Sequence, residues 1–561
     1  MASCSKDADS LFNDTADLVF TNGNIYTVNT DTPWVQSVGI KDGRIVALGS
    51  DAETAKWVGP QTKTVNLHGK LAMPSFGDAH VHPIFGGLSF AQCSLHNGRS
   101  VDAYIAIIKK CLAETPGDDL LFGRGWGPGY FPPDGVPHKN ILDALAPDRP
   151  VVIQSTGGHS YWVNSKALAL ANITKDTPDP AKGRIDRDPV TGEAVGGLQE
   201  TAKDIIQPFI PAPTDVEMQN AILYTVKLFN SLGITNWYDA GIDDIKPDGE
   251  SATLDAYTEV KAQGKLTTHV SIALKWDNDK SLDQIPTLYA VAKRAGAAGF
   301  SANGIKLYTD GVIVQRTAAV LEPYVDTKDD LGELSIPVQE LNDIVTKLDH
   351  DGFQVYVHSI GDRAVHETLN AFERARSVNG SNDNRHFIAH LNLVAPADQP
   401  RFSTLNVAAN FQPLWASDDP YMRLTAERLG PERMQYIYPA NSILQAGGRL
   451  VYGADWSVAS ADPLLGIEVA LTRKPTDRPE AKALLAHEGV TLAQAIKAYT
   501  LDVAFITHRE DETGSLEIGK SADLIVIDQN LFIIPVNDIS DSKVILTLFK
   551  GQTVYGSLSG L

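Results

Sequence analysis

Short apolar runs alternate with amphipathic segments along the middle of the chain. Apolar runs at 150–156 (PVVIQST), 234–240 (ITNWYDA), 304–311 (GIKLYTDG) and 353–359 (FQVYVHS) have the length and residue content of strands. The segment 338–352 (VQELNDIVTKLDHDG) repeats its apolar residues at helical spacing. About eight such strand–helix units predict an α/β fold, a (β/α)8 TIM barrel. A doubly wound open sheet is the alternative, but no Gly-rich phosphate loop follows an early strand.

Both ends of the chain show a different pattern, in which alternating apolar residues flank tight turns. Asn22-Gly23 and Asp42-Gly43 separate apolar runs near the start, and Lys550-Gly551 does so near the end. We therefore expect one composite β-sandwich built from both ends. A long stretch rich in Gly, Pro and Asp is expected to form loops over the barrel mouth. The predicted parts are a flexible segment, the sandwich, the barrel and this insertion: 1–15, 16–74 with 506–561, 75–505, and about 84–213.

Charge and composition exclude some classes of partner. The chain of 561 residues carries a formal net charge of −21, which argues against binding to nucleic acid or to an anionic membrane surface. No apolar run approaches the length of about 20 residues that spans a bilayer. We expect no nucleic-acid partner and no membrane span, and leave open whether the chain forms a homodimer.

Three cysteines, Cys4, Cys93 and Cys111, are too few for a disulfide framework and match no zinc-binding spacing. We expect Cys93 and Cys111 to be small buried side chains and Cys4 to be a free thiol. Ala-Ser-Cys ahead of the polar SKDADS stretch resembles the end of a lipoprotein signal, but residues 1–10 contain no apolar segment. Two localisations stay open: cytoplasmic, or an exported bacterial lipoprotein whose signal has been removed and whose Cys4 is a lipidation remnant.

Candidate metal ligands follow the predicted first barrel strand. The stretch 77–83 (GDAHVHP) places His80 and His82 two residues apart, so in a strand both imidazoles point to the same face. Two adjacent imidazoles suit a divalent cation. An isolated pair of this kind is equally well explained by histidines in a polar loop, so the rest of the chain has to decide.

Other predicted strands carry further candidate ligands. Lys306 lies within an apolar strand, His358 ends the run FQVYVHS, His390 ends RHFIAH, and Asp455 follows RLVYGA. Each of these residues alone fits an ordinary structural role. Because active sites of (β/α)8 barrels form at the C-terminal ends of the strands, the whole set predicts a metal site there. His386 is left out, because it lies four residues before the strand end.

Five segments, in this order along the chain, resemble the amidohydrolase superfamily: DAHVHP, GIKLYTDG, VHSIGDRAV, RHFIAHLNLV and YGADWSV. Within it, the chain is similar to the amidohydrolase family 3 branch, which includes N-substituted formamide deformylase-like metal-dependent hydrolases. The resemblance extends to GGHSYWVNS at 157–165, GGLQE at 196–200 and the closing GSLEIGKSADLIVID. It implies the same barrel and composite sandwich, and it specifies the substrate only weakly.

The resemblance implies a binuclear metal centre. Two histidine pairs would each hold one ion: His80 with His82, and His358 with His390. Lys306 would be carboxylated by CO2 and bridge the ions, since a carbamate is an anionic oxygen ligand whereas an ammonium would be repelled. Desolvation beside cations lowers a lysine pKa and supplies the neutral amine that carboxylation needs. Zn2+ is the default ion for this histidine-rich set, and Mn2+ or Fe2+ would also fit.

The implied reaction is hydrolysis of a non-peptide C–N bond in a small-molecule amide by metal-activated water. Asp455, beside the bridging water, would accept its proton and return it to the leaving nitrogen. His159 is the candidate contact for the substrate carbonyl or oxyanion, and Trp126 and Glu200 are candidate pocket residues. Aromatic residues of the insertion suggest an apolar or aryl substrate group, or else ordinary packing: Phe85, Trp126, Tyr130, Phe131 and Trp162.

Two alternatives are left open. A mononuclear site, with Lys306 unmodified, would act on another C–N bond or on an ester; its ligands would be His80, His82, His358 and Asp455. A non-catalytic binding or regulatory protein that kept the barrel is the other alternative. The full ligand set argues against it, since a retired site should lose some of these residues.

Overall fold

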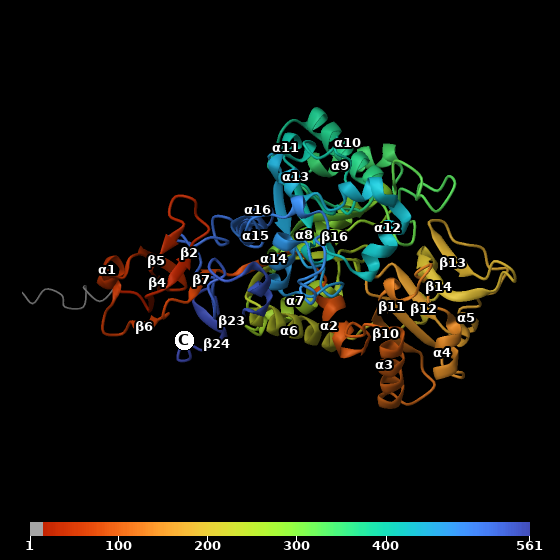
Figure 1. The fold of residues 1–561 in the computed structure, drawn as a ribbon, viewed down its shortest axis with the longest axis horizontal. Helices are drawn as coiled ribbons and strands as arrows, with labels where there is room; N and C mark the ends of the chain where they lie inside the picture. Colours follow the sequence, from red (N-terminus) through yellow and green to blue (C-terminus); the bar gives the residue numbers. More distant parts are fainter. Residues whose placement is uncertain (1–14) are drawn as a thin grey trace, which may run out of the picture.

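The chain forms three regions in a row, with a barrel between a β-sandwich at one end and the insertion at the other (Figure 1). The computed structural model describes residues 15–561. The expectations for Cys4 and for the flexible N-terminal segment therefore fall outside the described residues, apart from Thr15.

Eight parallel strands form the barrel, and their spatial order follows the chain. They are β8 (Phe76–Val81), β15 (Ile234–Ile242), β16 (His269–Lys275), β17 (Ser301–Tyr308), β18 (Gln354–Ser359), β19 (Phe387–His390), β20 (Ala408–Phe411) and β21 (Arg449–Tyr452). A parallel bridge between Val81 and Trp456 joins the first strand to the segment after the last, so the barrel is nearly closed. The predicted (β/α)8 architecture is confirmed.

Helices cover the outside of this barrel. The main ones are α6 (Asp215–Ser231), α7 (Ala252–Ala262), α8 (Ile285–Ala297), α9 (Val338–His350), α10 (Asp362–Asn379), α12 (Pro420–Arg433) and α14 (Pro463–Thr472). The helix predicted over 338–352 is α9, which buries Leu341, Ile344 and Leu348. These positions lie three or four residues apart, so they form one apolar face that packs inward.

The short helix α16 (Leu501–Ile506) covers the bottom of the barrel. Its Val503 belongs to the same buried cluster as Tyr238 and Tyr356 in the barrel interior. Gly77 of β8 allows this contact, because a Cβ at that position would lie 2.7 Å from Val503 Cγ1. The C-terminal ends of the strands meet at the opposite end of the barrel, where active sites of this fold form.

Both ends of the chain build the sandwich, as predicted. One sheet has the order β5–β4–β1–β6, with β1 (Leu18–Thr21), β4 (Ser37–Lys41), β5 (Arg44–Gly49) and β6 (Lys63–Asn66). The other has the order β24–β23–β22–β7–β2–β3, with β2 (Asn24–Tyr26), β3 (Trp34–Val35), β7 (Leu71–Pro74), β22 (Leu524–Ile527), β23 (Val544–Phe549) and β24 (Gln552–Gly556). Antiparallel pairing of β7 with β22 joins the N- and C-terminal segments, which lie side by side in Figure 1. Phe20 and Leu524 share one buried cluster between the sheets.

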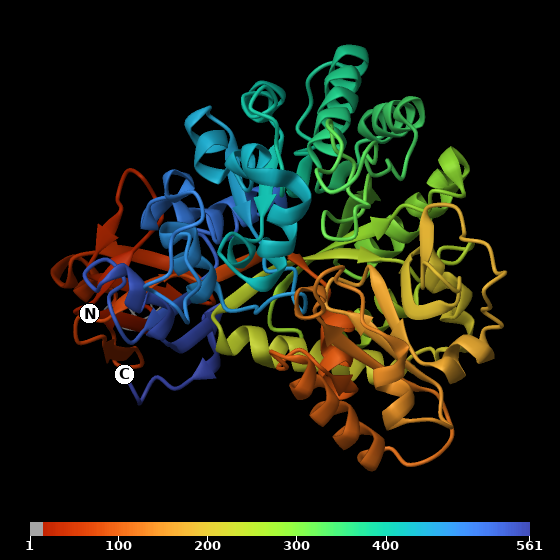
Figure 2. The ribbon, with the colours of Figure 1, turned by 45° about the vertical axis from the view of Figure 1, so that its right-hand side comes forward.

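The insertion, predicted as loops over the barrel mouth, contains a sheet of its own. Six strands run in the order β13–β14–β12–β11–β10–β9: β9 (Cys93–Ser94), β10 (Leu121–Trp126), β11 (Val151–Ser155), β12 (Ser160–Val163), β13 (Gly183–Arg187) and β14 (Ala194–Glu200). Figure 2 shows this sheet with α3 (Val101–Glu114) and α4 (Lys139–Leu145) beside it. The run 150–156, predicted as part of the barrel pattern, is β11 of this sheet. The Gly, Pro and Asp residues occupy its many short connections.

Cys93 and Cys111 form a disulfide, which corrects the expectation of two separate thiols. The cysteines are 18 residues apart in sequence, but α3 packs against β9, so their Cα atoms are 5.6 Å apart. This distance lies within the usual range for a disulfide. The pairing depends on how the helix meets the sheet, which the number and spacing of cysteines do not reveal.

Within residues 15–561, the structure has no helix whose length and apolar character would let it cross a bilayer.

Candidate active site

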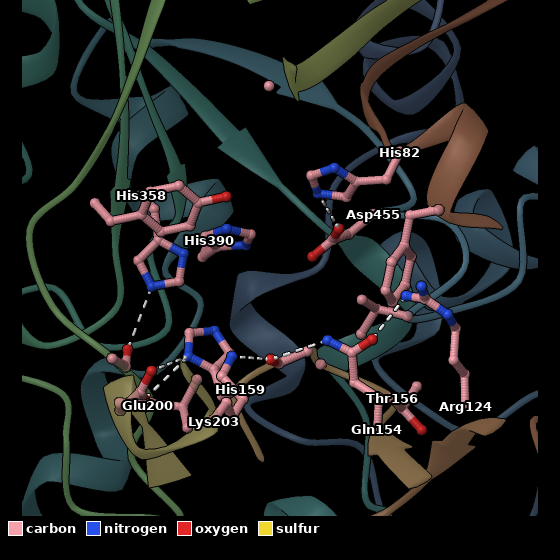
Figure 3. Close-up of a pocket in the computed structure, with 18 of the residues that line it drawn as sticks. His82, Arg124, Gln154, Thr156, His159, Glu200, Lys203, His358, His390 and Asp455 are labelled. Carbon is pink, nitrogen blue, oxygen red and sulfur yellow. Dashed lines mark hydrogen bonds and ion pairs between the residues drawn. The ribbon is translucent and has the colours of Figure 1, made fainter. Parts of the chain in front are cut away.

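A cavity of about 2380 Å³ lies at the C-terminal ends of the barrel strands, with walls from both the barrel and the insertion. Most of the residues predicted from the sequence line it: His80, His82, His159, Glu200, His358, His390 and Asp455. All of these except His80 are labelled in Figure 3.

His80, His82 and Asp455 form a compact group of potential metal ligands. Each offers one ligand atom, and these atoms lie within 4.8 Å of one another. The Nε2 atoms of His80 and His82 are 3.5 and 3.4 Å from Asp455 Oδ1. That oxygen is buried and accepts no hydrogen bond. A buried carboxylate oxygen without a donor, next to two imidazole nitrogens, fits a bound divalent cation.

Backbone contacts between the first and last barrel strands position this group. Asp455 follows β21 with a φ of 52°, and its N–H donates to the His80 carbonyl at 2.8 Å. The Asp78 carboxylate accepts hydrogen bonds from the N–H groups of His80 and Ala454, both at 3.0 Å. Burial raises the pKa of Asp78 to about 8. The turn that carries Asp455 is thus tied to the strand that carries the histidines.

His358 and His390 form a second pair, at the ends of β18 and β19. Their ring centroids are 4.4 Å apart, and the His390 ring is 4.7 Å from that of His80. Burial lowers the pKa of both rings well below the usual value, and neighbouring histidines add to the effect. Both are therefore neutral near pH 7, which is the form that binds metal.

Gln412 sets the tautomer of His390. Gln412 Nε2 donates to Asn410 at 2.9 Å, so Gln412 presents its oxygen to the ring. His390 Nδ1 donates to that oxygen, also at 2.9 Å. The lone pair of His390 is consequently on Nε2, where a metal can use it.

Lys306 lies inside the barrel beside these histidines. Its side chain is fully buried, and Nζ has no hydrogen-bond partner. Nζ is 4.0 Å from the centroid of the Tyr356 ring, which packs 5.3 Å from the His80 ring. Burial lowers the pKa of Lys306 to about 7, against the opposing effect of Asp455. A substantial fraction of the side chain is therefore a neutral amine at physiological pH.

His159 enters the cavity from the turn between β11 and β12. Its Nδ1 is 3.0 Å from both carboxylate oxygens of Glu200, and its ring centroid is 5.5 Å from that of His358. The Thr317 hydroxyl donates to Glu200 Oε1 at 2.9 Å. Burial would raise the pKa of Glu200, but the charge and hydrogen bond of His159 outweigh it, so this pKa is lowered. Glu200 is thus an anion that orients the His159 ring.

Trp126 is not brought to the cavity. It is fully buried in the core of the insertion, where Nε1 donates to the Ile153 carbonyl at 2.8 Å. Phe131 and Trp162 belong to the same buried cluster, so packing explains these aromatics. Phe85 and Tyr130, by contrast, line the cavity. His386 was left out of the predicted set; its Nε2 pairs with Asp349 at 2.8 Å.

Two cavity residues were not found from the sequence. Asp239 of β15 accepts a hydrogen bond from the Tyr257 hydroxyl at 2.8 Å, and burial raises its pKa to about 6. Trp415 stacks on His390 with ring centroids 5.4 Å apart. Both lie at or beyond the C-terminal half of a barrel strand, and this position is the signal that could have found them.

Comparisons with known proteins agree with this fold. The sequence profile described as "Amidohydrolase family" matches residues 63–555, so the chain belongs to the amidohydrolase family. The family predicted from the motifs is thereby confirmed, and with it the hydrolase class.

Full-length relatives and a solved structure are similar to this chain. Protein LONG AFTER FAR-RED 3 of Arabidopsis thaliana is 30% identical over 96% of this chain and 92% of its own length. Putative amidohydrolase YtcJ of Bacillus subtilis is 29% identical, over 96% and 99%. N-substituted formamide deformylase of Arthrobacter pascens is 23% identical, over 96% and 98%. An uncharacterized metal-dependent hydrolase from Pyrococcus horikoshii has the same fold, with a TM-score of 0.70, 24% identity, and coverage of 92% of this chain and 99% of that one.

Proposed function

We propose that this chain hydrolyses a C–N bond, other than a peptide bond, in a small-molecule amide by attack of a metal-activated water. The observation that carries the proposal is the approach of His80, His82 and Asp455 ligand atoms to within 4.8 Å of one another. The names of two relatives, a putative amidohydrolase and an N-substituted formamide deformylase, favour an amide bond over an ester.

The proposed cofactor is a pair of divalent cations, with Zn2+ as the default and Mn2+ or Fe2+ as alternatives. His80 and His82 would hold one ion, His358 and His390 the other, and a carboxylated Lys306 would bridge them. The buried, unpartnered Nζ of Lys306 and its pKa of about 7 fit this role, since only a neutral amine reacts with CO2. When bound, the cations lower the pKa of the attacking water and polarise the substrate carbonyl.

The proposed proton carrier is Asp455. Its Oδ1 faces the two histidines without a hydrogen-bond donor, so it can accept the proton of the attacking water. The same carboxyl group would then donate that proton to the leaving nitrogen. In its protonated form, His159 would keep Nδ1–H on Glu200 and donate a hydrogen bond from Nε2–H to the substrate carbonyl oxygen.

A mononuclear arrangement is the second candidate. It is favoured by one observation: in residues 15–561, the compact ligand group consists of His80, His82 and Asp455, without His358 or His390. In that arrangement Lys306 would stay an unmodified amine.

Metal content of the wild type and of Lys306→Arg distinguishes the two arrangements. We expect about two ions per chain in the fully active wild type. A guanidinium stays cationic and cannot be carboxylated, so Lys306→Arg should lose bound metal and turnover together. Lys275→Arg is the matched control. Lys275 is the register partner of Lys306 on the neighbouring strand β16, but its side chain is partly exposed and pairs with Asp243. Elemental analysis and amide hydrolysis are measured on the same samples. One ion per active chain, with near-normal turnover of Lys306→Arg, would favour the mononuclear site.

A further inference from the structure

Arg124 is a cation in the wall of the cavity, held in place by aromatic rings. It belongs to β10 of the insertion, and its guanidinium carbon lies 4.3 Å from the ring centroid of Phe85 and 4.8 Å from that of Phe122. One guanidinium nitrogen, Nη1, donates to Gln154 Oε1 at 2.7 Å, and Nε donates to Gln92 at 3.4 Å. Figure 3 shows the Arg124–Gln154 contact facing the cavity. These contacts fix the orientation of the guanidinium and leave Nη2 and the second N–H of Nη1 for a ligand.

In the described part of the chain, no carboxylate lies within ion-pair distance of Arg124. Another arginine of the same cavity, Arg316, pairs with Asp326. Burial lowers the pKa of Arg124 to about 10, so the group, which is partly buried, is still a cation at neutral pH. A partly buried charge without a counterion is unfavourable, and an anionic ligand would supply the missing partner.

The position of Arg124 links it to both sides of the candidate active site. Phe85, on which Arg124 lies, has its ring centroid 6.3 Å from that of the candidate ligand His82. Gln154, which Arg124 contacts, donates through Nε2 to the carbonyl of Gly158 at 3.4 Å, next to His159. A substrate whose amide reached His82 and His159 would therefore bring a neighbouring substituent to Arg124.

We propose that Arg124 determines specificity by binding a carboxylate that the substrate carries close to its scissile amide. The inference rests on the proposed function, because it assumes that an amide is cleaved beside His82. A planar guanidinium matches a carboxylate through paired hydrogen bonds. A single guanidinium balances one negative charge, so a monoanionic carboxylate is a better match than a dianionic phosphate. The substrate class is an N-acylated amino acid or a similar amide with one adjacent carboxylate.

Matched substrates test this assignment. N-acylphenylalanines are compared with N-acylphenethylamines, which lack only the carboxylate, using formyl, acetyl and benzoyl groups. We expect the metal-loaded wild type to prefer the acids. Arg124→Met keeps the packing against Phe85 and Phe122 but removes the charge. It should lower kcat/KM for the acids by about 10- to 100-fold, mainly through KM, and change the phenethylamines only a few-fold. Arg124→Lys, which keeps the charge without the fork, should be intermediate.

Arg99→Met is the matched control, since Arg99 is an exposed arginine of the same cavity, and it should leave the preference unchanged. Equal hydrolysis of acids and phenethylamines by the wild type, or an unchanged preference in both Arg124 variants, would overturn the inference and leave the proposed function standing.

If the wild type cleaves none of the amides, the proposed function fails. Calorimetry with N-acylphenylalanine then decides about Arg124: binding weakened about 10- to 100-fold by Arg124→Met supports the carboxylate site, and equal binding refutes it. The last comparison uses the analogue of N-acylphenylalanine in which a phosphonate replaces the carboxylate. If the wild type binds this phosphonate more tightly than N-acylphenylalanine, the choice of a carboxylate is overturned.

Discussion

Asp455 lies where one carboxylate can act both as a metal ligand and as a proton carrier. Its Oδ1 lies 3.4 Å from His82 Nε2, within reach of an ion shared with the histidines, and it accepts no hydrogen bond. Its backbone N–H donates to the His80 carbonyl, which fixes the main chain at Asp455 against β8. A carboxylate in this position can bind metal and can also carry a proton.

Asp455→Asn separates metal binding from proton transfer. Asparagine tolerates the positive φ of 52° at this position, so the turn should be preserved. An amide cannot accept the proton of the attacking water, and turnover should fall about 10²- to 10⁴-fold. Most of the metal should remain, because four histidines and the Lys306 carbamate would still hold it. Metal content and kcat are measured on the same preparation.

Asp243→Asn, at an exposed acid of the same cavity, is the control for charge and should change kcat only a few-fold. If Asp455→Asn retains metal and activity within a few-fold of the wild type, Asp455 is a structural turn residue. His159 would then be the next candidate for the proton carrier.

At the scale of single residues, the sequence locates the candidate ligands well and their surroundings poorly. His80, His358, His390 and Asp455 could be found because each ends or follows an apolar run that forms a barrel strand. Trp126 was assigned to the pocket only because it is aromatic, and its burial depends on how the insertion folds. Arg124 gives no signal in the sequence, since its missing counterion is a property of three-dimensional packing.

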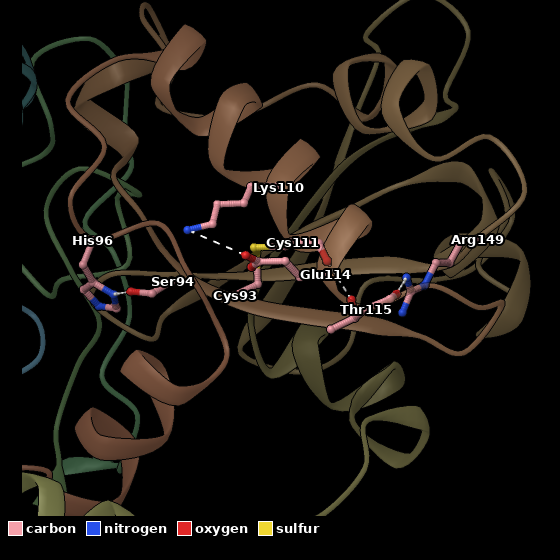
Figure 4. The surroundings of a disulfide bond; sticks show 8 residues. All are labelled: Cys93, Ser94, His96, Lys110, Cys111, Glu114, Thr115 and Arg149. Carbon is pink, nitrogen blue, oxygen red and sulfur yellow. Dashed lines mark hydrogen bonds and ion pairs between the residues drawn. A yellow bond between two sulfur atoms is a disulfide. The ribbon is translucent and has the colours of Figure 1, made fainter.

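At the scale of elements, the disulfide fixes α3 to the edge strand of the insertion (Figure 4). Cys93 is in β9, and the next residue, Ser94, pairs with Arg124 in β10. The cross-link therefore stabilises the edge of the sheet next to the strand that carries Arg124. This part of the fold was predicted as loops, because strands of two to seven residues separated by Gly and Pro turns have no long periodic pattern.

The double variant Cys93→Ala/Cys111→Ala should lose about 3 kcal/mol of unfolding free energy, since the disulfide closes a loop of 18 residues in the unfolded chain. Alanine leaves little steric change at the buried Cys93. Urea unfolding is followed by tryptophan fluorescence, because Trp126 and Trp162 are buried in the cluster next to the disulfide. Reductant should destabilise the wild type by a similar amount and leave the double variant unchanged. Equal stability of wild type and variant under oxidising conditions would show that the cross-link adds nothing.

At the scale of the whole molecule, the sandwich and the barrel are joined by a buried ion pair. Asp523, just before β22, has its Oδ2 2.8 Å from Nε2 of His269, the first residue of the barrel strand β16. Its other oxygen accepts hydrogen bonds from the Ser521 hydroxyl at 2.8 Å and from the Lys550 N–H at 2.7 Å. Both partners of the ion pair are buried, so it couples the C-terminal segment to the barrel core.

Asp523→Ala should destabilise the molecule by about 3–5 kcal/mol at pH 7, because it removes the nearer acidic partner of the buried His269 and leaves only Glu512, 3.9 Å from Nδ1. Asp255→Ala, which breaks the exposed pair with Arg294, is the control and should cost at most about 1 kcal/mol.

Burial would raise the pKa of Asp523, but the hydrogen bond and charge of His269 lower it below the ordinary value. The stabilisation is therefore complete above a pH of about 4, the pKa of an unfolded aspartate, and is lost as the pH falls through the lower folded value. Urea unfolding from pH 7 downward should show the difference between wild type and Asp523→Ala shrinking below pH 4, as far as both proteins stay folded. A small difference at pH 7, or one that grows on acidification, would mean that the joint between sandwich and barrel does not depend on the Asp523 charge.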